Sequence, residues 1–168
     1  MSNQKYSTPK IATSDICDAM DDAAHIVDLA FHTYGGCTDF SGPALTLKTD
    51  NDNSEVKTLL KSPGEGRVLV IDNGGQMNRA MVGGNLAKWG VENGWAAIVV
   101  IGCVRDRHEL IKQDIAVIAL GCCPKKSDKG SAQSQYSDVT IGTITIKTGM
   151  WVTGDLDGLI VTMGKPKT

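Results

Sequence analysis

Hydrophobic residues occur in several short runs that predict β-strands. Residues 67–72, 96–101 and 115–120 are hydrophobic at most positions and are bounded by glycines or polar turns. Runs of this kind are typical of strands covered on both faces. Residues 44–48 alternate between hydrophobic and polar positions instead, which predicts a further strand.

Other stretches show the spacing of amphipathic helices. Thr13-Ser14-Asp15 offers a helix N-cap, and the hydrophobic positions that follow predict a helix that continues, or is followed by a second one, to about Phe31. A short helix is predicted between the polar turn at 50–54 and the Pro-Gly stop at 63–66, with one helical turn at 108–113.

Residues 78–101 have the pattern of a strand, a glycine turn, a helix and a second strand. The first strand is predicted over 78–82, the helix over 85–93, and the central strand over 96–101. A crossover of this kind joins parallel strands. The sheet should therefore contain at least one parallel pair.

The C-terminal part of the chain is predicted to be β-rich, after a polar loop at 122–135 that is mobile or forms a contact surface. The whole pattern predicts an α/β protein with a polar leader over 1–10 and a single domain over 11–168. The predicted C-terminal strands are 139–141, 144–146, 150–152 and 159–161, with turns at 142–143 and 155–158.

Composition narrows the class of protein. A chain of 168 residues, 41% hydrophobic and 21% charged, fits one globular domain. A net charge of −2 argues against direct nucleic-acid binding, and no hydrophobic run approaches the length of a membrane span. The five cysteines form no C-x-x-C pair, and the first ten residues lack the hydrophobic region of a secretory signal, so we expect a cytoplasmic protein.

The candidate site combines Gly83-Gly84, before a helix, with Arg105-Asp106, after a strand. The first N–H groups of a helix bind anions, and arginine can donate two parallel hydrogen bonds to a carboxylate. Asp106 can hold magnesium or manganese, which commonly use one carboxylate together with water and substrate oxygens. Taken alone, the glycines could be a tight turn with positive φ, and Arg105-Asp106 a surface ion pair.

Other polar residues give weaker indications. His25, His32 and His108 are scattered rather than spaced as zinc ligands. Cys103 has no identifiable partner base and is interpreted as a small buried residue. Glu109, like His108, is close enough in sequence to support Asp106 from a second layer, although a solvated helix start explains it equally well.

The segments Gly-Gly-Asn-Leu at 83–86 and Gly-Cys-Val-Arg-Asp at 102–106, followed by Glu109, resemble the class II pyruvate aldolases. The similarity extends from about Ile11 to Val161. That family contains metal-dependent 4-hydroxy-4-methyl-2-oxoglutarate aldolases, which also decarboxylate oxaloacetate. It also contains a second branch, the regulator of ribonuclease E activity, protein A.

The resemblance implies a compact fold of the swivelling phosphohistidine-domain type, a ββα sandwich, assembled as a homotrimer with sites between subunits. It implies that Arg105 and Asp106 are the catalytic residues, with Arg105 binding the pyruvyl unit of a small keto acid. Asp106 would hold the divalent metal, Mg²⁺ or Mn²⁺. The implied substrate-binding residues, acting chiefly through backbone N–H groups, are Gly83, Gly84, Asn85 and Leu86.

Two functions follow from the resemblance. The first is a lyase that cleaves 4-hydroxy-4-methyl-2-oxoglutarate to pyruvate and decarboxylates oxaloacetate. The second is a non-catalytic trimer that binds and inhibits ribonuclease E. Asp106 favours the lyase, because the regulator branch lacks the metal-binding aspartate after the arginine. Asn85 is not a base, so the proton must pass to a metal-bound water or to a residue of another subunit.

Overall fold

The computed structural model describes residues 10–130 and 134–167. Apart from Lys10, the predicted polar leader lies outside these residues. Within the described part of the chain, no helix is long and apolar enough to cross a membrane.

The described residues form short helices and a large mixed sheet. The helices are α1 (Thr13–Met20), a 3-10 turn (Asp21–Ala23), α2 (Ser54–Leu60), α3 (Gly84–Glu92) and α4 (Arg107–Leu110). The strands are β1 (His25–Ile26), β2 (His32–Thr33), β3 (Phe40–Lys48), β4 (Val68–Asp72), β5 (Ala80–Val82), β6 (Ala97–Val104), β7 (Ala116–Cys122), β8 (Val139–Ile141), β9 (Ile144–Ile146), β10 (Trp151–Gly154) and β11 (Leu159–Thr162).

The main sheet has the strand order β1-β11-β10-β3-β4-β6-β7-β2, and β5 pairs with β6 outside this path. Strands β3, β4, β6 and β7 are parallel to one another, and β5 is parallel to β6. The predicted crossover is therefore confirmed, with α3 joining β5 to β6. The remaining strand pairs are antiparallel.

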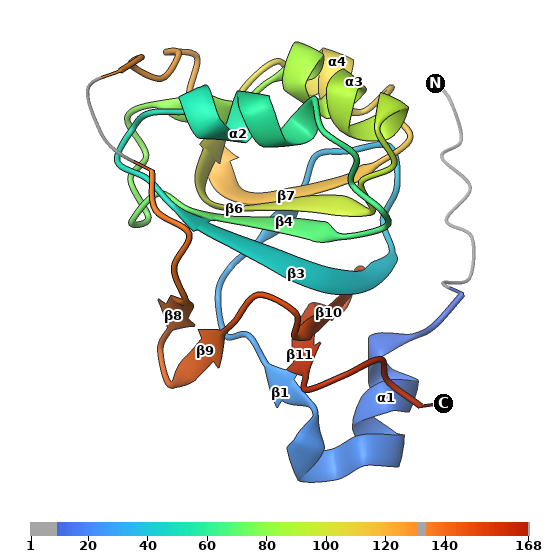
Figure 1. The fold of residues 1–168 in the computed structure, drawn as a ribbon. Coiled ribbons are helices and arrows are strands. Elements are labelled where there is room, and N and C mark those ends of the chain that lie inside the picture. The colour runs from blue at the N-terminus through green and yellow to red at the C-terminus, as the bar shows by residue number, and fades with distance from the viewer. Residues whose placement is uncertain (1–9, 131–133, 168) are drawn as a thin grey trace.

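The molecule has three layers. Figure 1 shows α2, α3 and α4 on one side of the parallel strands, and β10, β11 and the β8–β9 hairpin on the other side. The long strand β3 belongs to both sheet regions, because it pairs with β4 over residues 44–48 and with β10 over residues 40–43. The predicted ββα arrangement is confirmed.

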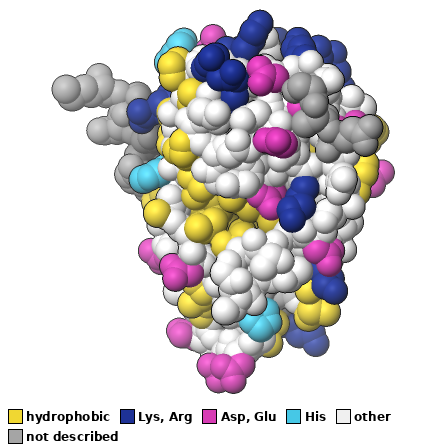
Figure 2. Space-filling view, turned by 90° about the vertical axis from the view of Figure 1, so that its left-hand side faces the viewer, with side chains coloured by type: hydrophobic (Ala, Val, Ile, Leu, Met, Phe, Trp, Pro, Cys, Tyr) yellow, Lys and Arg dark blue, Asp and Glu magenta, His cyan; other side chains and the backbone are white. Residues whose placement is uncertain are grey.

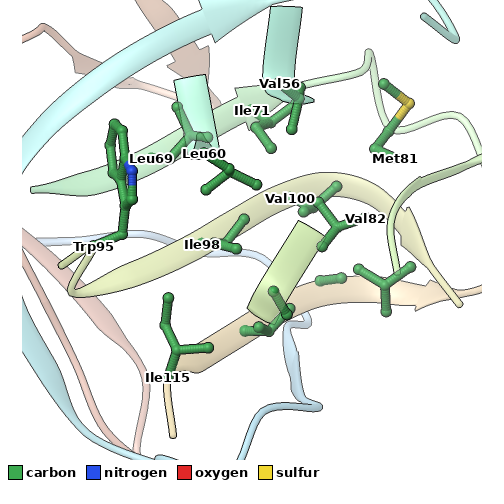
Figure 3. Close-up of a cluster of buried hydrophobic side chains, with 14 of the residues drawn as sticks. Val56, Leu60, Leu69, Ile71, Met81, Val82, Trp95, Ile98, Val100 and Ile115 are labelled. Atoms are coloured by element: carbon green, nitrogen blue, oxygen red, sulfur yellow. The ribbon is translucent and has the colours of Figure 1, made fainter. Parts of the chain in front are cut away.

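A hydrophobic core lies between each pair of adjacent layers. The core under the helices contains β-strand residues such as Leu69 and Ile98, helix residues such as Leu60, and Trp95 (Figure 3). The indole N–H of Trp95 donates to the Ser62 carbonyl at 3.1 Å, so this buried polar group has a partner. The second core lies between the parallel strands and the C-terminal strands.

The predicted helix reaching Phe31 is wrong beyond residue 23. The chain leaves α1 at Asp21, whose φ of 45° is incompatible with a continuing helix. It then makes two short edge strands: Ile26 pairs with Ile160, and Thr33 pairs with Ile118. The conformation of this segment is determined by pairing with strands that are distant in sequence. The local spacing of hydrophobic residues gives no sign of that pairing.

Two predicted strands are longer than expected. β3 begins at Phe40 rather than at residue 44, and β6 continues past residue 101 to Val104. The extension of β6 passes through Gly102, whose φ is 157°, at a shift in register against β7. Consequently, β6 ends immediately before Arg105.

The described residues of the predicted polar loop at 122–135 pair with strands and turns of the rest of the domain. Isolated bridges join Lys126 to Ala80, Asp128 to Asp52 and Gln135 to Lys48. Residues 131–133 lie outside the described part of the chain.

Candidate active site

The ends of three neighbouring strands bring the predicted site residues together. β6 lies between β5 and β7 near its carboxyl end, with Val104 opposite both Val82 and Cys122. The backbone N–H of Arg105 donates to the Val82 carbonyl at 3.0 Å. The segment after β6 therefore starts beside Gly83, although it is more than twenty residues away in sequence.

Asp106 reaches the beginning of α3. Its backbone adopts the left-handed conformation, with φ 60° and ψ 44°, which aspartate tolerates better than most residues. Its carbonyl accepts the N–H groups of Glu109 at 2.8 Å and Leu110 at 2.9 Å, which starts α4. Its side-chain Oδ2 accepts the Gly84 N–H at 3.2 Å. This carboxylate thus caps α3 from another segment of the chain.

Glycine is required at positions 83 and 84 because other side chains approach these residues closely. The alternative, a tight turn with positive φ, is wrong. Gly83 has φ −135°, and Gly84 is the first residue of α3. A Cβ at position 83 would lie 2.5 Å from Asp106 Oδ2 and 3.3 Å from Arg105 Cγ. A Cβ at position 84 would overlap the carboxylate of Glu109. Two acidic side chains therefore approach the start of α3 where only glycine leaves room.

Arg105 lies on the same side of the glycine pair. Its Nε is 3.8 Å from Asp106 Oδ2, and its side chain is 39% exposed. The contact with Asp106 uses Nε, while the guanidinium carries further donors for a carboxylate ligand.

The rest of the predicted substrate-binding segment forms the first turn of α3. Asn85 is exposed, and Leu86 is partly buried against the core beneath the helices. Backbone N–H groups in the first turn of a helix have no partner within the helix. The structure therefore places the first backbone amides of α3, a guanidinium and a carboxylate side by side.

The residues present fit a hard divalent cation held by few protein ligands. Asp106 is a half-buried oxygen donor with its side chain 36% exposed. Across the described residues, no group of three or more His, Cys, Asp or Glu side chains converges to hold a metal ion. Magnesium and manganese are often bound by one or two carboxylates, with water and substrate oxygens completing the shell.

Near the site, Arg107 and Tyr34 form a contact that sequence reasoning missed. The Arg107 guanidinium lies 5.6 Å from the centre of the Tyr34 ring. Burial, followed by a hydrogen bond with the Cys122 thiol, raises the pKa of Tyr34 to about 12. No local pattern connects Tyr34 to this region, because β2 reaches it by pairing with β7.

Several other sequence candidates lie elsewhere. His25 lines a separate hollow of about 150 Å³ together with residues of the β8–β9 hairpin and β11, and this hollow contains no residue of the candidate site. Gly74 and Gly75 have φ of 65° and 70°, a conformation that glycine adopts readily in turns. Cys103 is fully buried, as predicted, with its Sγ 3.4 Å from Met77 Sδ.

The surface is not uniform in charge. Figure 2 shows Lys and Arg side chains gathered at the end of the molecule that carries the helices, with a patch of hydrophobic side chains below them. Lys57 Nζ, on α2, lies 5.8 Å from the centre of the Trp89 ring, and Lys61 Nζ, directly after α2, lies 4.2 Å from it. The helical end therefore presents a basic surface over an aromatic side chain.

The fold and the site define a class: a mixed α/β domain whose parallel strands end at a helix N-terminus, a guanidinium and a carboxylate. The model of the RraA-like family, described as Aldolase/RraA, matches residues 13–161. The chain belongs to this family.

Curated relatives include proteins of Burkholderia mallei (strain SAVP1) and Burkholderia pseudomallei (strain K96243). Each is 45% identical to this chain over 155 residues, which cover 89% of this chain and 94% of the relative. Both carry the provisional name 4-hydroxy-4-methyl-2-oxoglutarate aldolase.

Solved structures support the same fold. The RNA-processing inhibitor RraA from Thermus thermophilus is 34% identical, with a TM-score of 0.88, and the match covers 94% of this chain and 96% of that one. A Geobacillus kaustophilus protein described as an S-adenosylmethionine:2-dimethylmenaquinone methyltransferase is 35% identical, with a TM-score of 0.86, and the match covers 92% and 96%. Similar chains thus carry three different functional names, and the choice among them depends on the site.

Proposed function

We propose that this protein is a divalent-metal-dependent lyase of the cytoplasm that cleaves 4-hydroxy-4-methyl-2-oxoglutarate to pyruvate and also decarboxylates oxaloacetate. One observation carries the proposal: the side chains of Arg105 and Asp106 both approach the glycine pair at the start of α3. The 45% identity to relatives provisionally named as this aldolase supports the same choice.

The residues of the chain have distinct roles in this proposal. The amides of the first turn of α3 and the guanidinium of Arg105 bind the carboxylate and keto group of the substrate, which fixes its pyruvyl unit. Asp106 is the ligand that would hold Mg²⁺ or Mn²⁺ beside the pyruvyl unit. A bound cation would supply Lewis acidity for the cleavage of the carbon–carbon bond.

Orientation is the main contribution of the protein itself. The α3 amides follow β5, Asp106 follows β6, and a hydrogen bond joins Asp106 to Gly84, so a bound keto acid keeps one position relative to the cation ligand. The side chains of Arg105 and Asp106 are still more than one-third exposed in the single chain. The proposal therefore includes a homotrimer in which a neighbouring subunit covers each site.

The direct test measures pyruvate released from 4-hydroxy-4-methyl-2-oxoglutarate and from oxaloacetate with Mg²⁺ or Mn²⁺. We expect turnover that disappears with a chelator and falls at least ~100-fold in Asp106→Ala. Asp18→Ala, which removes an exposed carboxylate from α1, serves as the matched control and should keep full activity. Turnover that survives both the chelator and Asp106→Ala would refute the lyase.

A second candidate function is inhibition of a ribonuclease E-type enzyme. The 34% identity to RraA and the basic surface around Lys57, Lys61 and Trp89 favour it, since that surface suits an acidic segment of a protein partner. Adding the purified protein to ribonuclease E should then slow RNA cleavage, and Lys57→Glu with Lys61→Glu should abolish the effect. Unchanged cleavage at saturating protein would exclude this function.

A further inference from the structure

We propose that the thioether of Met77 and the thiols of Cys103 and Cys123 form a binding site for a soft monovalent cation, Cu⁺. The three sulfur atoms belong to the loop after β4 and to the ends of β6 and β7. This site is distinct from the proposed hard-cation ligand, Asp106, and it does not depend on the lyase function proposed above.

Two of the three sulfur atoms are in direct contact. The thiol of Cys103 donates to the thioether of Met77, with Sγ 3.4 Å from Sδ. Cys103 is fully buried, whereas Met77 is 47% exposed, so an ion can reach the pair from the methionine side. A cation that takes the place of the thiol proton is held by a thiolate and a thioether, and the proton passes to solvent.

The position of Met77 depends on a glycine in the neighbouring strand. Cys103 pairs with Gly121 of β7, and a Cβ at position 121 would overlap the methyl group of Met77. The loop that carries Met77 is joined to β6, because the Gly75 N–H donates to the Ile101 carbonyl at 3.2 Å. These contacts place the thioether over the end of β6.

Cys123 supplies the third sulfur atom from the same face of the sheet. Its N–H donates to the Val104 carbonyl at 3.0 Å, which continues the pairing of β7 with β6 by one residue. Because side chains alternate along a strand, Cys123 lies on the same face as Gly121 and its partner Cys103. Burial, followed by the charge interaction with Cys123, raises the pKa of the Cys103 thiol, which agrees with this proximity.

The donor set selects the kind of cation. Thiolate and thioether sulfurs are soft ligands that favour Cu⁺, whereas magnesium and manganese prefer oxygen. Structural zinc takes four protein ligands, and among the described residues no third His, Cys, Asp or Glu side chain joins the two thiols. Cu⁺ needs fewer ligands than zinc, so a site of two cysteines and a methionine suits it best.

An ordinary packing contact between Met77 and Cys103 makes a different prediction. Methionine and cysteine both fill space in protein interiors, and Met77→Leu keeps nearly the same volume while it removes the sulfur atom. If the contact serves packing alone, Met77→Leu should bind Cu⁺ as the unaltered protein does. Met163→Leu is the matched control, because Met163 lines a hollow that contains no cysteine.

The first measurement follows the methyl groups of the 6 methionines by carbon-13 NMR in the unaltered protein. Ag⁺, a soft cation that resists redox change, is added up to 5 equivalents, one for each cysteine. We expect the methyl resonance of Met77 to shift and that of Met163 to stay in place. Met77→Leu identifies the Met77 resonance, which is missing from its spectrum.

The second measurement determines Cu⁺ affinity by competition with a coloured Cu⁺ chelator in the absence of oxygen. The parent protein carries serine in place of Cys17, Cys37 and Cys122, the free cysteines outside the proposed site. Loss of a ligand should cost at least as much as loss of a residue that supports one, so we expect Met77→Leu to weaken Cu⁺ binding at least ~10-fold. Met163→Leu should leave the affinity unchanged.

The inference is overturned if the Met77 methyl resonance does not move, if it moves no further than that of Met163, or if Met77→Leu and Met163→Leu bind Cu⁺ equally well. The NMR titration uses the unaltered protein, so poor folding of a variant does not affect its result. Pyruvate release is measured without Cu⁺, and its outcome therefore bears on the lyase alone.

Discussion

The carboxylate of Asp106 accepts a hydrogen bond from the backbone N–H of Gly84 at 3.2 Å, across 22 residues of sequence. This contact joins the segment after β6 to the first turn of α3. It places the proposed cation ligand next to the amides that are proposed to bind the substrate. The position of Asp106 therefore depends on the absence of a side chain at the neighbouring Gly83.

Gly83→Ala should disable the site with little loss of the fold. The new methyl group would lie 2.5 Å from Asp106 Oδ2 and would displace that carboxylate. Because a shift of about 1 Å in a catalytic group can cost ~100-fold in rate, we expect pyruvate release to fall by about this factor. Gly164→Ala, where a Cβ would meet open space, is the matched control. Near-normal turnover of Gly83→Ala would contradict the proposed geometry.

Arg105→Lys should weaken substrate binding more than it slows the chemical step. Lysine keeps the charge but loses the planar pair of donors that fits a carboxylate. A lost charged hydrogen bond is worth ~1.5–3 kcal/mol, so we expect KM for oxaloacetate to rise at least ~10-fold. Arg107→Lys, which alters a guanidinium that lies over Tyr34, is the nearby control. Steady-state kinetics should show KM raised only for Arg105→Lys.

The central strands could be predicted from the sequence because their burial on both faces requires continuous hydrophobic residues. β4, β6 and β7 are found within a few residues of the predicted ranges. The two-residue strands β1 and β2 could not be predicted in this way. They exist because Ile26 and Thr33 meet partners in β11 and β7, and such pairing leaves no local periodicity.

The residues of the candidate site could be predicted from the sequence, but the contacts that bring them together could not. Arg105 and Asp106 could be recognised at a strand end beside a glycine pair, which is where open sheets bind ligands. The left-handed backbone of Asp106 has no signature in the sequence, since most aspartates avoid it. The reason for the glycines could not be found either, because two acids contact them only in the folded chain.

Asp52→Ala should destabilise the domain. The Asp52 side chain is 1% exposed, and it accepts the N–H of Ser54 at 2.8 Å and the N–H of Gly130 at 2.7 Å. Its loss leaves two backbone donors without this carboxylate, at a cost of ~2 kcal/mol or more. Urea denaturation should show the change. Asp128→Ala, which removes an exposed partner of Arg79, should cost less than ~1 kcal/mol.

Cys37 should react slowly with iodoacetamide at pH 9. Burial, followed by the hydrogen bond from its thiol to Asp114 at 3.1 Å, raises the pKa of Cys37 to about 11. Since the thiolate is the reactive form, Asp114→Asn should speed alkylation several-fold by lowering this pKa. Asp39 acts on Cys37 without a hydrogen bond, so Asp39→Asn should have a smaller effect. Peptide mass spectrometry can follow Cys37 alone, and equal effects of the two variants would count against the Asp114 contact.

Tyr34 should make the fold sensitive to alkaline pH. Its pKa is raised to about 12, first by burial and then by the Cys122 thiol, from an ordinary value of 10.0. The folded protein therefore holds the phenolic proton more tightly than the unfolded chain does. The resulting stabilisation is complete below pH 10 and is lost as pH rises towards 12.

Tyr34→Phe should consequently show a shallower loss of stability between pH 10 and 12, measured as the urea midpoint at several pH values. Cys122→Ala keeps the phenol and most of its burial while removing the second cause of the shift. In that variant, absorbance at 295 nm should show a tyrosine titrating at lower pH than in the unaltered protein. An identical pH dependence for Tyr34→Phe and the unaltered protein would mean that the phenol of Tyr34 does not contribute to alkaline unfolding.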